Sequence, residues 1–151
     1  MYKHILAALD GSPRAPHVLH HAAELAARTG AVLHLGRSVH LPLGIPADAL
    51  TLTGDQLTAR LLAYGAQELT ALAEGLHPTH TPIRWGQRLC RFGAPAQVIV
   101  DLAEELHADL VVLGSHGYDM LDRVLGTTAA RIVNHARCSV LVVRGDALPA
   151  A

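Results

Sequence analysis

Residues 109–117 read DLVVLGSHG and carry the clearest structural signal in the chain. Its apolar part, residues 110–113, shows no alternation of polar and apolar side chains. A continuous apolar run of this length is typical of a strand in a parallel sheet, where both faces are covered. Because the run leads directly into Gly114, we expect the chain to leave the sheet there and to enter a glycine-rich loop.

Outward from this strand, short apolar runs alternate with longer segments in which apolar residues recur every three or four positions. The runs predict strands at residues 5–9, 32–39, 83–91, 109–113 and 139–143, and the periodic segments predict helices at 13–29, 53–76, 95–106 and 127–137. This alternation predicts one α/β domain over residues 1–145: an open parallel five-stranded sheet with helices on both faces. Residues 146–151 are expected to form a C-terminal tail.

Local signals mark several helix ends. Ser12 is expected to cap the first helix, with Pro13 as its first residue and Gly30 as its end. Residues 53–56, Thr-Gly-Asp-Gln, resemble a capping box and predict the start of the second helix.

Composition excludes several classes of function. The 151 residues carry a net charge of −1 with no cluster of Lys and Arg, which disfavours nucleic acid as a partner. The two cysteines, Cys90 and Cys138, form no paired framework, which is typical of a reducing compartment. The apolar stretch at residues 5–9 is too short for a signal peptide or a membrane span, so we expect a cytoplasmic protein that is not membrane-bound.

The loop that follows residue 113 contains the candidate phosphate-binding residues. Gly114 and Gly117 are followed, after eight residues, by Gly126 and Thr127 at the start of a predicted helix. The first turn of a helix offers unpaired N–H groups to an anion, and glycines let phosphate oxygens approach the backbone. The lysine-containing GxxxxGK[ST] loop and the GxGxxG motif are both absent. The alternative is purely structural: a strand end, a turn and close helix packing.

The segment from Gly114 to Arg144 resembles the C-terminal signature of the universal stress protein family, whose nucleotide-binding branch carries G-x2-G-x9-G-[ST]; the spacer here is eight. The opening HILAALDGSPRA and the segment ADLVVLGSHG also resemble that family. The resemblance implies the strand order 3-2-1-4-5 and a Rossmann-like site for ATP or another adenine nucleotide. Ligands of such sheets lie beyond the carboxyl ends of the strands, where the strand order reverses.

The resemblance also implies roles for individual residues. Asp10 would contact the adenosine with Ala8 beside it, and the backbone of Ser38 would contact adenine. Leu113 and Gly114 would line the ribose or α-phosphate region. The phosphates would lie among four residues: Gly117, Gly126, Thr127 and Thr128.

Other residues have two interpretations each. His17, His20 and His21 share one helix and would bind a metal or, more simply, form a solvated face. Asp119 and Asp122 would hold Mg²⁺ against the phosphates or be surface charges. His116 and Arg123 are candidates for phosphate contacts, with exposed loop side chains as the alternative. Cys138 is expected to be a packing residue.

The leading hypothesis for function is a nucleotide-dependent stress-response sensor or regulator in which ATP occupancy changes association with an unidentified protein partner. It would be at most a slow ATPase, because no complete catalytic set accompanies the loop. One alternative is an ATP-hydrolysing or adenylyl-transferring enzyme, and another is a nucleotide-free structural dimer. The last strand, from Ser139 to Arg144, is apolar and is expected to pair with its copy in a homodimer.

Overall fold

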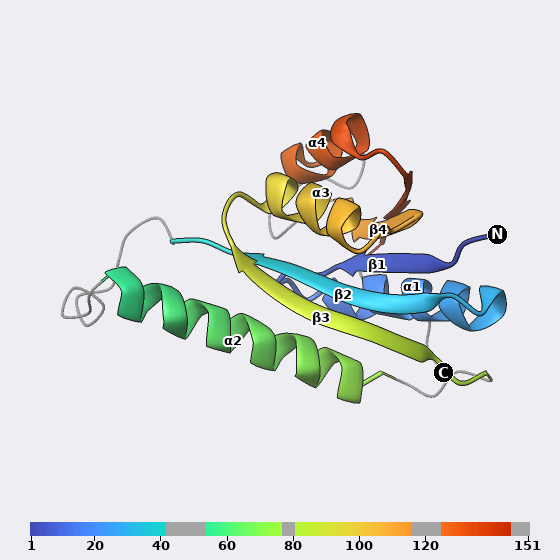
Figure 1. Cartoon of the computed structure of the whole chain (residues 1–151), viewed down its shortest axis with the longest axis horizontal. Coiled ribbons are helices and arrows are strands. Elements are labelled where there is room, and N and C mark those ends of the chain that lie inside the picture. Colours follow the sequence, from blue (N-terminus) through green and yellow to red (C-terminus); the bar gives the residue numbers. More distant parts are fainter. Residues whose placement is uncertain (42–53, 77–80, 116–124, 146–151) are drawn as a thin grey trace.

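The computed structural model describes residues 1–41, 54–76, 81–115 and 125–145, which form alternating strands and helices (Figure 1). The elements in chain order are β1 (His4–Ala8), α1 (Ala15–Thr29), β2 (Val32–Val39), α2 (Gly54–Glu74), β3 (Arg84–Phe92), α3 (Pro95–Glu105), β4 (Leu110–Gly114), α4 (Thr127–His135) and β5 (Ser139–Val143). The strands form one parallel sheet in the order β3-β2-β1-β4-β5, which confirms the predicted fold class and strand order.

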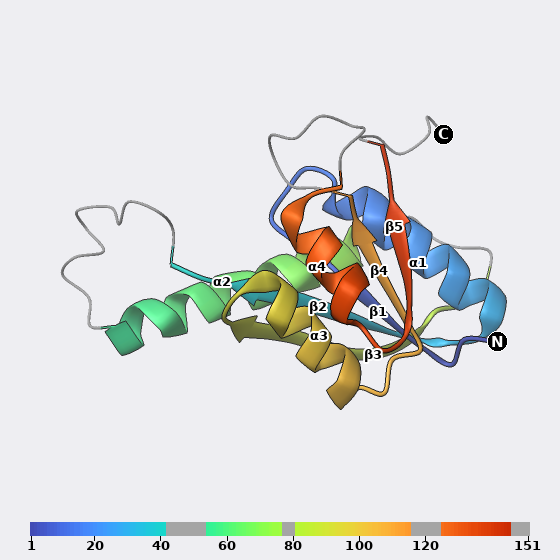
Figure 2. The same ribbon diagram turned by 90° about the horizontal axis from the view of Figure 1, so that it is seen from above.

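The helices cover both faces of the sheet, as predicted. Figures 1 and 2 show α1 and α2 on one face and α3 and α4 on the other. Alternate residues of β1 serve the two layers: Ile5 and Ala7 belong to the core under α1 and α2, and Leu6 belongs to the core under α3 and α4. All three side chains are fully buried. Complete burial on both faces explains why the strands in the middle of the sheet lack polar alternation.

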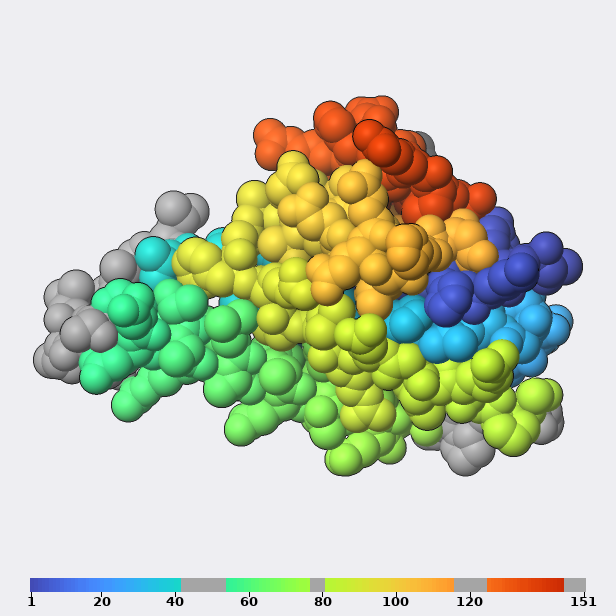
Figure 3. All heavy atoms as spheres, in the orientation of Figure 1, coloured from blue at the N-terminus to red at the C-terminus, as the bar shows by residue number. Residues whose placement is uncertain are grey.

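The first turns of α2 extend past the body of the sheet (Figures 1 and 3). The buried side chains of α2 come from its second half, where Leu69 and Ala73 join the core. α2 packs tightly on the sheet at Gly65, since a Cβ there would lie 2.5 Å from Cys90 Sγ and 3.0 Å from Val39 Cγ1. Position 65 therefore sets how closely α2 packs on β2 and β3.

The predicted start of α1 was wrong by two residues. The backbone N–H of Ser12 donates to Asp10 Oδ1 at 3.0 Å, and the N–H of Arg14 donates to Ser12 Oγ at 3.3 Å. These bonds form a side-chain-stabilised turn that delays the helix until Ala15. The predicted end was right, because Gly30 adopts a left-handed conformation with φ of 71°. Thr53 of the predicted capping box lies outside the described residues.

β3 carries a β-bulge opposite His34 of β2. The pairs Leu33–Trp85 and Leu35–Arg88 leave both Gly86 and Gln87 opposite His34. The N–H of Gln87 donates to His34 Nδ1 at 3.0 Å. The neutral ring therefore carries its proton on Nε2, which donates to His4 Nδ1 at 3.2 Å. A Cβ on Gly86 would overlap the His34 imidazole, so the bulge requires glycine.

This bulge predicts a pH-dependent stability. Burial, together with the neighbouring charge of His4, lowers the pKa of His34 from its ordinary value of 6.5. The unfolded chain then binds the proton more readily, so the free energy of unfolding falls as pH decreases through 6.5 towards the lowered pKa. We expect His34→Asn, whose amide oxygen still accepts from Gln87 N–H, to lose less stability on acidification than the wild type.

Urea unfolding at about pH 7.5 and about pH 5.5 measures this difference. The comparison cancels the histidines that do not contact His34, because their surroundings are the same in both proteins. Equal losses in the wild type and in His34→Asn would show that His34 does not carry the effect.

Candidate functional site

A cavity of about 640 Å³ lies at the carboxyl ends of the strands. It is lined by the end of β1 and the following turn, the end of β2, α2, the start of α3, the end of β4 and the start of α4. Eight of the nine predicted site residues line it: Ala8, Asp10, Ser38, Leu113, Gly114, Gly126, Thr127 and Thr128. The ninth, Gly117, lies outside the described residues, as do His116, Asp119, Asp122 and Arg123. The predicted set thus comes together from four separate parts of the chain.

One end of the cavity is the first turn of α4. Its N-cap is Gly126, no side chain caps the helix, and Thr127 is the first helical residue. The Thr127 hydroxyl therefore does not cap the helix. The Gly126 amide donates to Ser115 O at 2.7 Å, which holds the entry to the helix against the end of β4. The first helical amides have no partner within the helix, and the turn that carries them lines the cavity.

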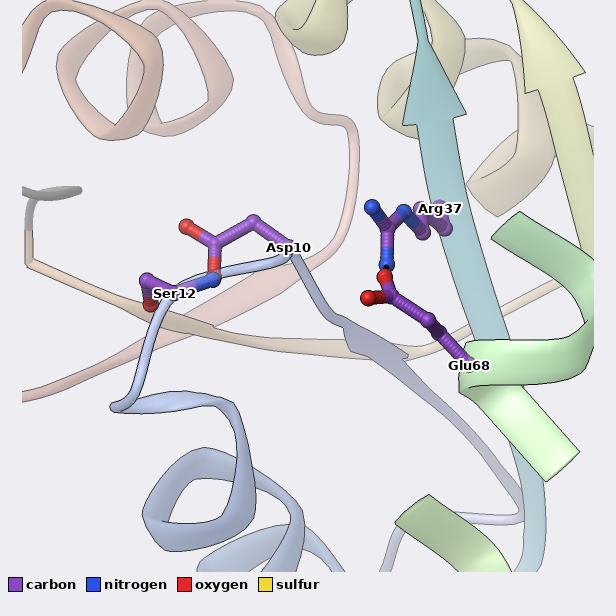
Figure 4. Close-up of polar contacts among 4 residues, drawn as sticks. All are labelled: Asp10, Ser12, Arg37 and Glu68. Carbon is purple, nitrogen blue, oxygen red and sulfur yellow. Dashed lines mark hydrogen bonds and ion pairs between the residues drawn. The ribbon is translucent and has the colours of Figure 1, made fainter. Parts of the chain in front are cut away.

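Asp10 lies in the middle of the site, directly after β1. The N–H of Leu9 donates to Gly36 O at 2.9 Å, so pairing with β2 continues up to this point. The exposed Asp10 carboxylate accepts the Ser12 amide through Oδ1, and this bond orients the side chain (Figure 4). A fixed carboxylate at a strand end is suited to accept hydrogen bonds from hydroxyl groups of a ligand.

Two predicted residues have structural partners as well. A Cβ on Gly114 would lie 3.3 Å from Val18 Cγ2, so the glycine allows α1 to pack closely against the end of β4. Ser38 Oγ donates to Gly93 O at 3.1 Å and ties the end of β2 to the turn before α3. The Ser38 hydroxyl is thus engaged, which leaves its backbone to face a ligand.

Part of the wall formed by β2 and α2 was not predicted from the sequence. Arg37, Leu61 and Tyr64 line the cavity there. Arg37 forms an ion pair with Glu68 of α2 through Nη1 and Oε2, as Figure 4 shows. Arg37 is the one charged residue within the apolar run of β2, and that was the available signal. Tyr64 gave no such signal, because its place on the cavity depends on how α2 packs.

A second, smaller cavity of about 420 Å³ adjoins the first, and Asp10 and Gly11 line both. Arg37 lines the larger cavity, whereas Glu68 lines the smaller one. The ion pair between these two side chains therefore lies at the boundary between the cavities.

Two of the three histidines of α1, His17 and His21, have hydrogen-bond partners. His17 Nε2 lies 3.3 Å from Arg144 O and links α1 to the end of β5, and His21 Nδ1 lies 3.0 Å from His17 O. His17 is buried, with 8 % of its surface exposed, so the expectation of a solvated face was wrong for this residue. Within residues 1–41, 54–76, 81–115 and 125–145, no group of three or more His, Cys, Asp or Glu residues is placed to hold a metal ion.

Both cysteines are free and half-buried. Burial raises the pKa of the Cys90 and Cys138 thiols, which favours the neutral form. Cys138 packs against the core under α3 and α4, in agreement with the predicted packing role. Among the helices of the described residues, none combines the length and the apolar character needed to cross a membrane.

A family model and a curated relative both match this chain over nearly its whole length. The family model described as "Universal stress protein family" matches residues 1–144. Universal stress protein A homolog 1 of Coxiella burnetii is 35% identical over 143 residues, covering 94% of this chain and 96% of the relative.

Two solved structures share the fold. A universal stress protein in complex with cAMP is 23% identical with a TM-score of 0.65, covering 95% of this chain and 97% of the other. A universal stress protein from Archaeoglobus fulgidus in complex with dAMP is 23% identical with a TM-score of 0.56, covering 95% and 98%. With the family match over nearly the whole chain, the conclusion is that the chain belongs to the universal stress protein family.

Proposed function

We propose that this chain binds ATP in the 640 Å³ cavity and acts as a nucleotide-dependent regulator in the stress response. The observation that carries the proposal is the meeting, in one cavity, of the uncapped first turn of α4 with the Asp10 carboxylate. Anions bind at helix N-termini, and ligands of open α/β sheets bind at the ends of the central strands. The complexes of two structural relatives with cAMP and dAMP support an adenine nucleotide as the ligand.

The proposed arrangement assigns each part of the nucleotide to residues of the cavity. The phosphates are assigned to Gly126, Thr127 and Thr128, which line the cavity and where backbone amides and the helix dipole stabilise negative charge. The resemblance to the family adds Gly117 to this group. The ribose lies near Asp10, Leu113 and Gly114, and the base lies towards Ala8 and Ser38. Mg²⁺, if it accompanies the phosphates, would be held by Asp119 and Asp122.

The proposed role is binding rather than turnover. Phosphoryl transfer needs a positioned nucleophile together with charges that stabilise the transition state. The charged side chains that line the cavity within the described residues are Asp10 and Arg37, and Arg37 is paired with Glu68. We therefore propose at most slow hydrolysis, with ATP occupancy changing how the protein associates with another protein in the cytoplasm.

Three measurements on one preparation test this function. Nucleotide is extracted from the purified protein, its melting temperature is followed against added ATP and Mg²⁺, and phosphate release is recorded. A ligand that binds only the folded chain raises stability by RT ln(1 + [L]/Kd). Stabilisation with negligible release supports the regulator, rapid release supports the enzyme, and the absence of any shift supports a nucleotide-free structural role.

We also propose a homodimer that pairs β5 with its copy. β5 is an edge strand, and Leu141 exposes 36% of its surface there. Open backbone groups beside an apolar side chain favour antiparallel pairing across a twofold axis. Leu141→Lys is expected to convert the dimer to a monomer in sedimentation velocity. Phe92→Lys, at an exposed aromatic on the opposite edge strand, is the matched control and should leave the dimer intact; the reverse result would place the interface on β3.

A further inference from the structure

We propose that Tyr64 and Arg37 form the base-recognition end of the cavity and give it a preference for purine over pyrimidine nucleotides. This inference rests on the proposed nucleotide-binding function and names the residues that read the base. Neither residue belongs to the glycine loop, and they reach the cavity from α2 and β2 respectively.

The position of the two residues follows from the layout of the site. The first turn of α4 forms one wall, and Asp10 lies at the strand ends between that wall and α2. The far wall consists of the end of β2 and the face of α2 that carries Leu61 and Tyr64 three residues apart. In a bound nucleotide the base lies at the opposite end from the terminal phosphate. A nucleotide with its phosphates at α4 and its ribose near Asp10 therefore directs its base to this wall.

Tyr64 is suited to stack on that base. Its side chain is 58% exposed although it lies on a helix packed against the sheet, and it lines the cavity. The adjacent Gly65 allows α2 to approach Cys90 and Val39 closely, which fixes the helix backbone that carries the ring. Aromatic side chains at the edge of nucleotide sites stack on the flat face of a base, and a purine offers a larger face than a pyrimidine.

Arg37 supplies a polar contact. Only 9% of its surface is exposed, and it lines the cavity while Nη1 contacts Glu68. Its Nε and Nη1 are fully buried, so a ligand in the cavity can meet the guanidinium only through Nη2. Nη2 lies beside the turn after β1, where a Cβ on Gly11 would be 3.1 Å from it. Ring nitrogens of a purine, such as N7, are acceptors of the kind that guanidinium groups contact.

The test uses calorimetric titration of ATP, AMP and CTP into the wild type and four variants. Tyr64→Ala should weaken ATP and AMP binding about tenfold and CTP binding less, because the loss is that of base stacking. Tyr64→Phe keeps the ring and should bind as the wild type does. Arg37→Met should weaken the binding of ATP and the binding of AMP to the same extent. Phe92→Ala removes an exposed ring that does not line the cavity and should change nothing.

The possible results distinguish the base-recognition role of Tyr64 and Arg37 from nucleotide binding itself. Wild-type protein that binds none of the three nucleotides overturns both proposals. If the wild type binds ATP and Tyr64→Ala binds it equally well, the base-recognition role is wrong while the nucleotide site stands. A loss in Arg37→Met that is confined to ATP and spares AMP would assign Arg37 to the outer phosphates and overturn its role at the base.

Discussion

Replacing Gly126 with valine is expected to abolish the stabilisation that ATP confers. Gly126 precedes the first turn of α4 and lines the cavity, so a branched side chain there stands in front of the amides proposed to bind phosphate. At 100 times Kd, ATP should stabilise the wild type by about 2.7 kcal/mol. For a chain of this size that corresponds to a rise of roughly 5–10 °C in melting temperature, which differential scanning fluorimetry measures.

The variant should remain folded without nucleotide. Gly126 has φ of −61° and ψ of 157°, a conformation that valine adopts without strain. Gly54→Val is the matched control, because a Cβ at position 54 meets no atom within 4 Å and this residue does not line the cavity. An undiminished ATP shift in Gly126→Val would mean that the phosphates bind elsewhere.

Gly65→Ala is expected to destabilise the fold by about 1–3 kcal/mol, the usual effect of overpacking a tightly packed contact. Alanine is intrinsically better than glycine inside a helix, by about 1 kcal/mol, so a net loss can only come from tertiary packing. The new methyl group would lie 2.5 Å from Cys90 Sγ and 3.0 Å from Val39 Cγ1, which forces α2 away from the sheet. Because Tyr64 moves with α2, nucleotide binding should weaken as well.

Two further variants test whether the contact with Cys90 destabilises Gly65→Ala. Adding Cys90→Ala removes the sulfur nearest to the new methyl group and should recover part of the stability in urea unfolding. Gly54→Ala, on the same helix but in open space, should leave stability unchanged or slightly raised. If Gly65→Ala proves as stable as Gly54→Ala, α2 does not pack against β2 and β3 as closely as described.

The fold was predictable because its signals are local. The apolar run at β4 and the glycines after it lie within one short segment, and they identify a buried strand followed by a loop. The same holds for Gly30, whose left-handed conformation ends α1. The start of α1 was missed because Asp10 and Ser12 use their side chains to build a turn, and this competes with capping the helix directly.

The missed part of the site depends on contacts between distant segments. Tyr64 reaches the cavity only because Gly65 lets α2 lie against β2 and β3, and no pattern within α2 reports that approach. Arg37 was visible as a charge in an apolar strand, but its partner Glu68 lies 31 residues later on another element. His17 was judged by its helical spacing alone, whereas its burial results from contact with the end of β5.

A crystal structure of the protein grown with saturating ATP is the most direct test of whether the nucleotide binds at the first turn of α4. We expect density for a nucleotide whose phosphates accept hydrogen bonds from the amides of Thr127 and Thr128, with the ribose hydroxyls at Asp10. A cavity that stays empty at saturating ATP, or a nucleotide bound away from the first turn of α4, would contradict it.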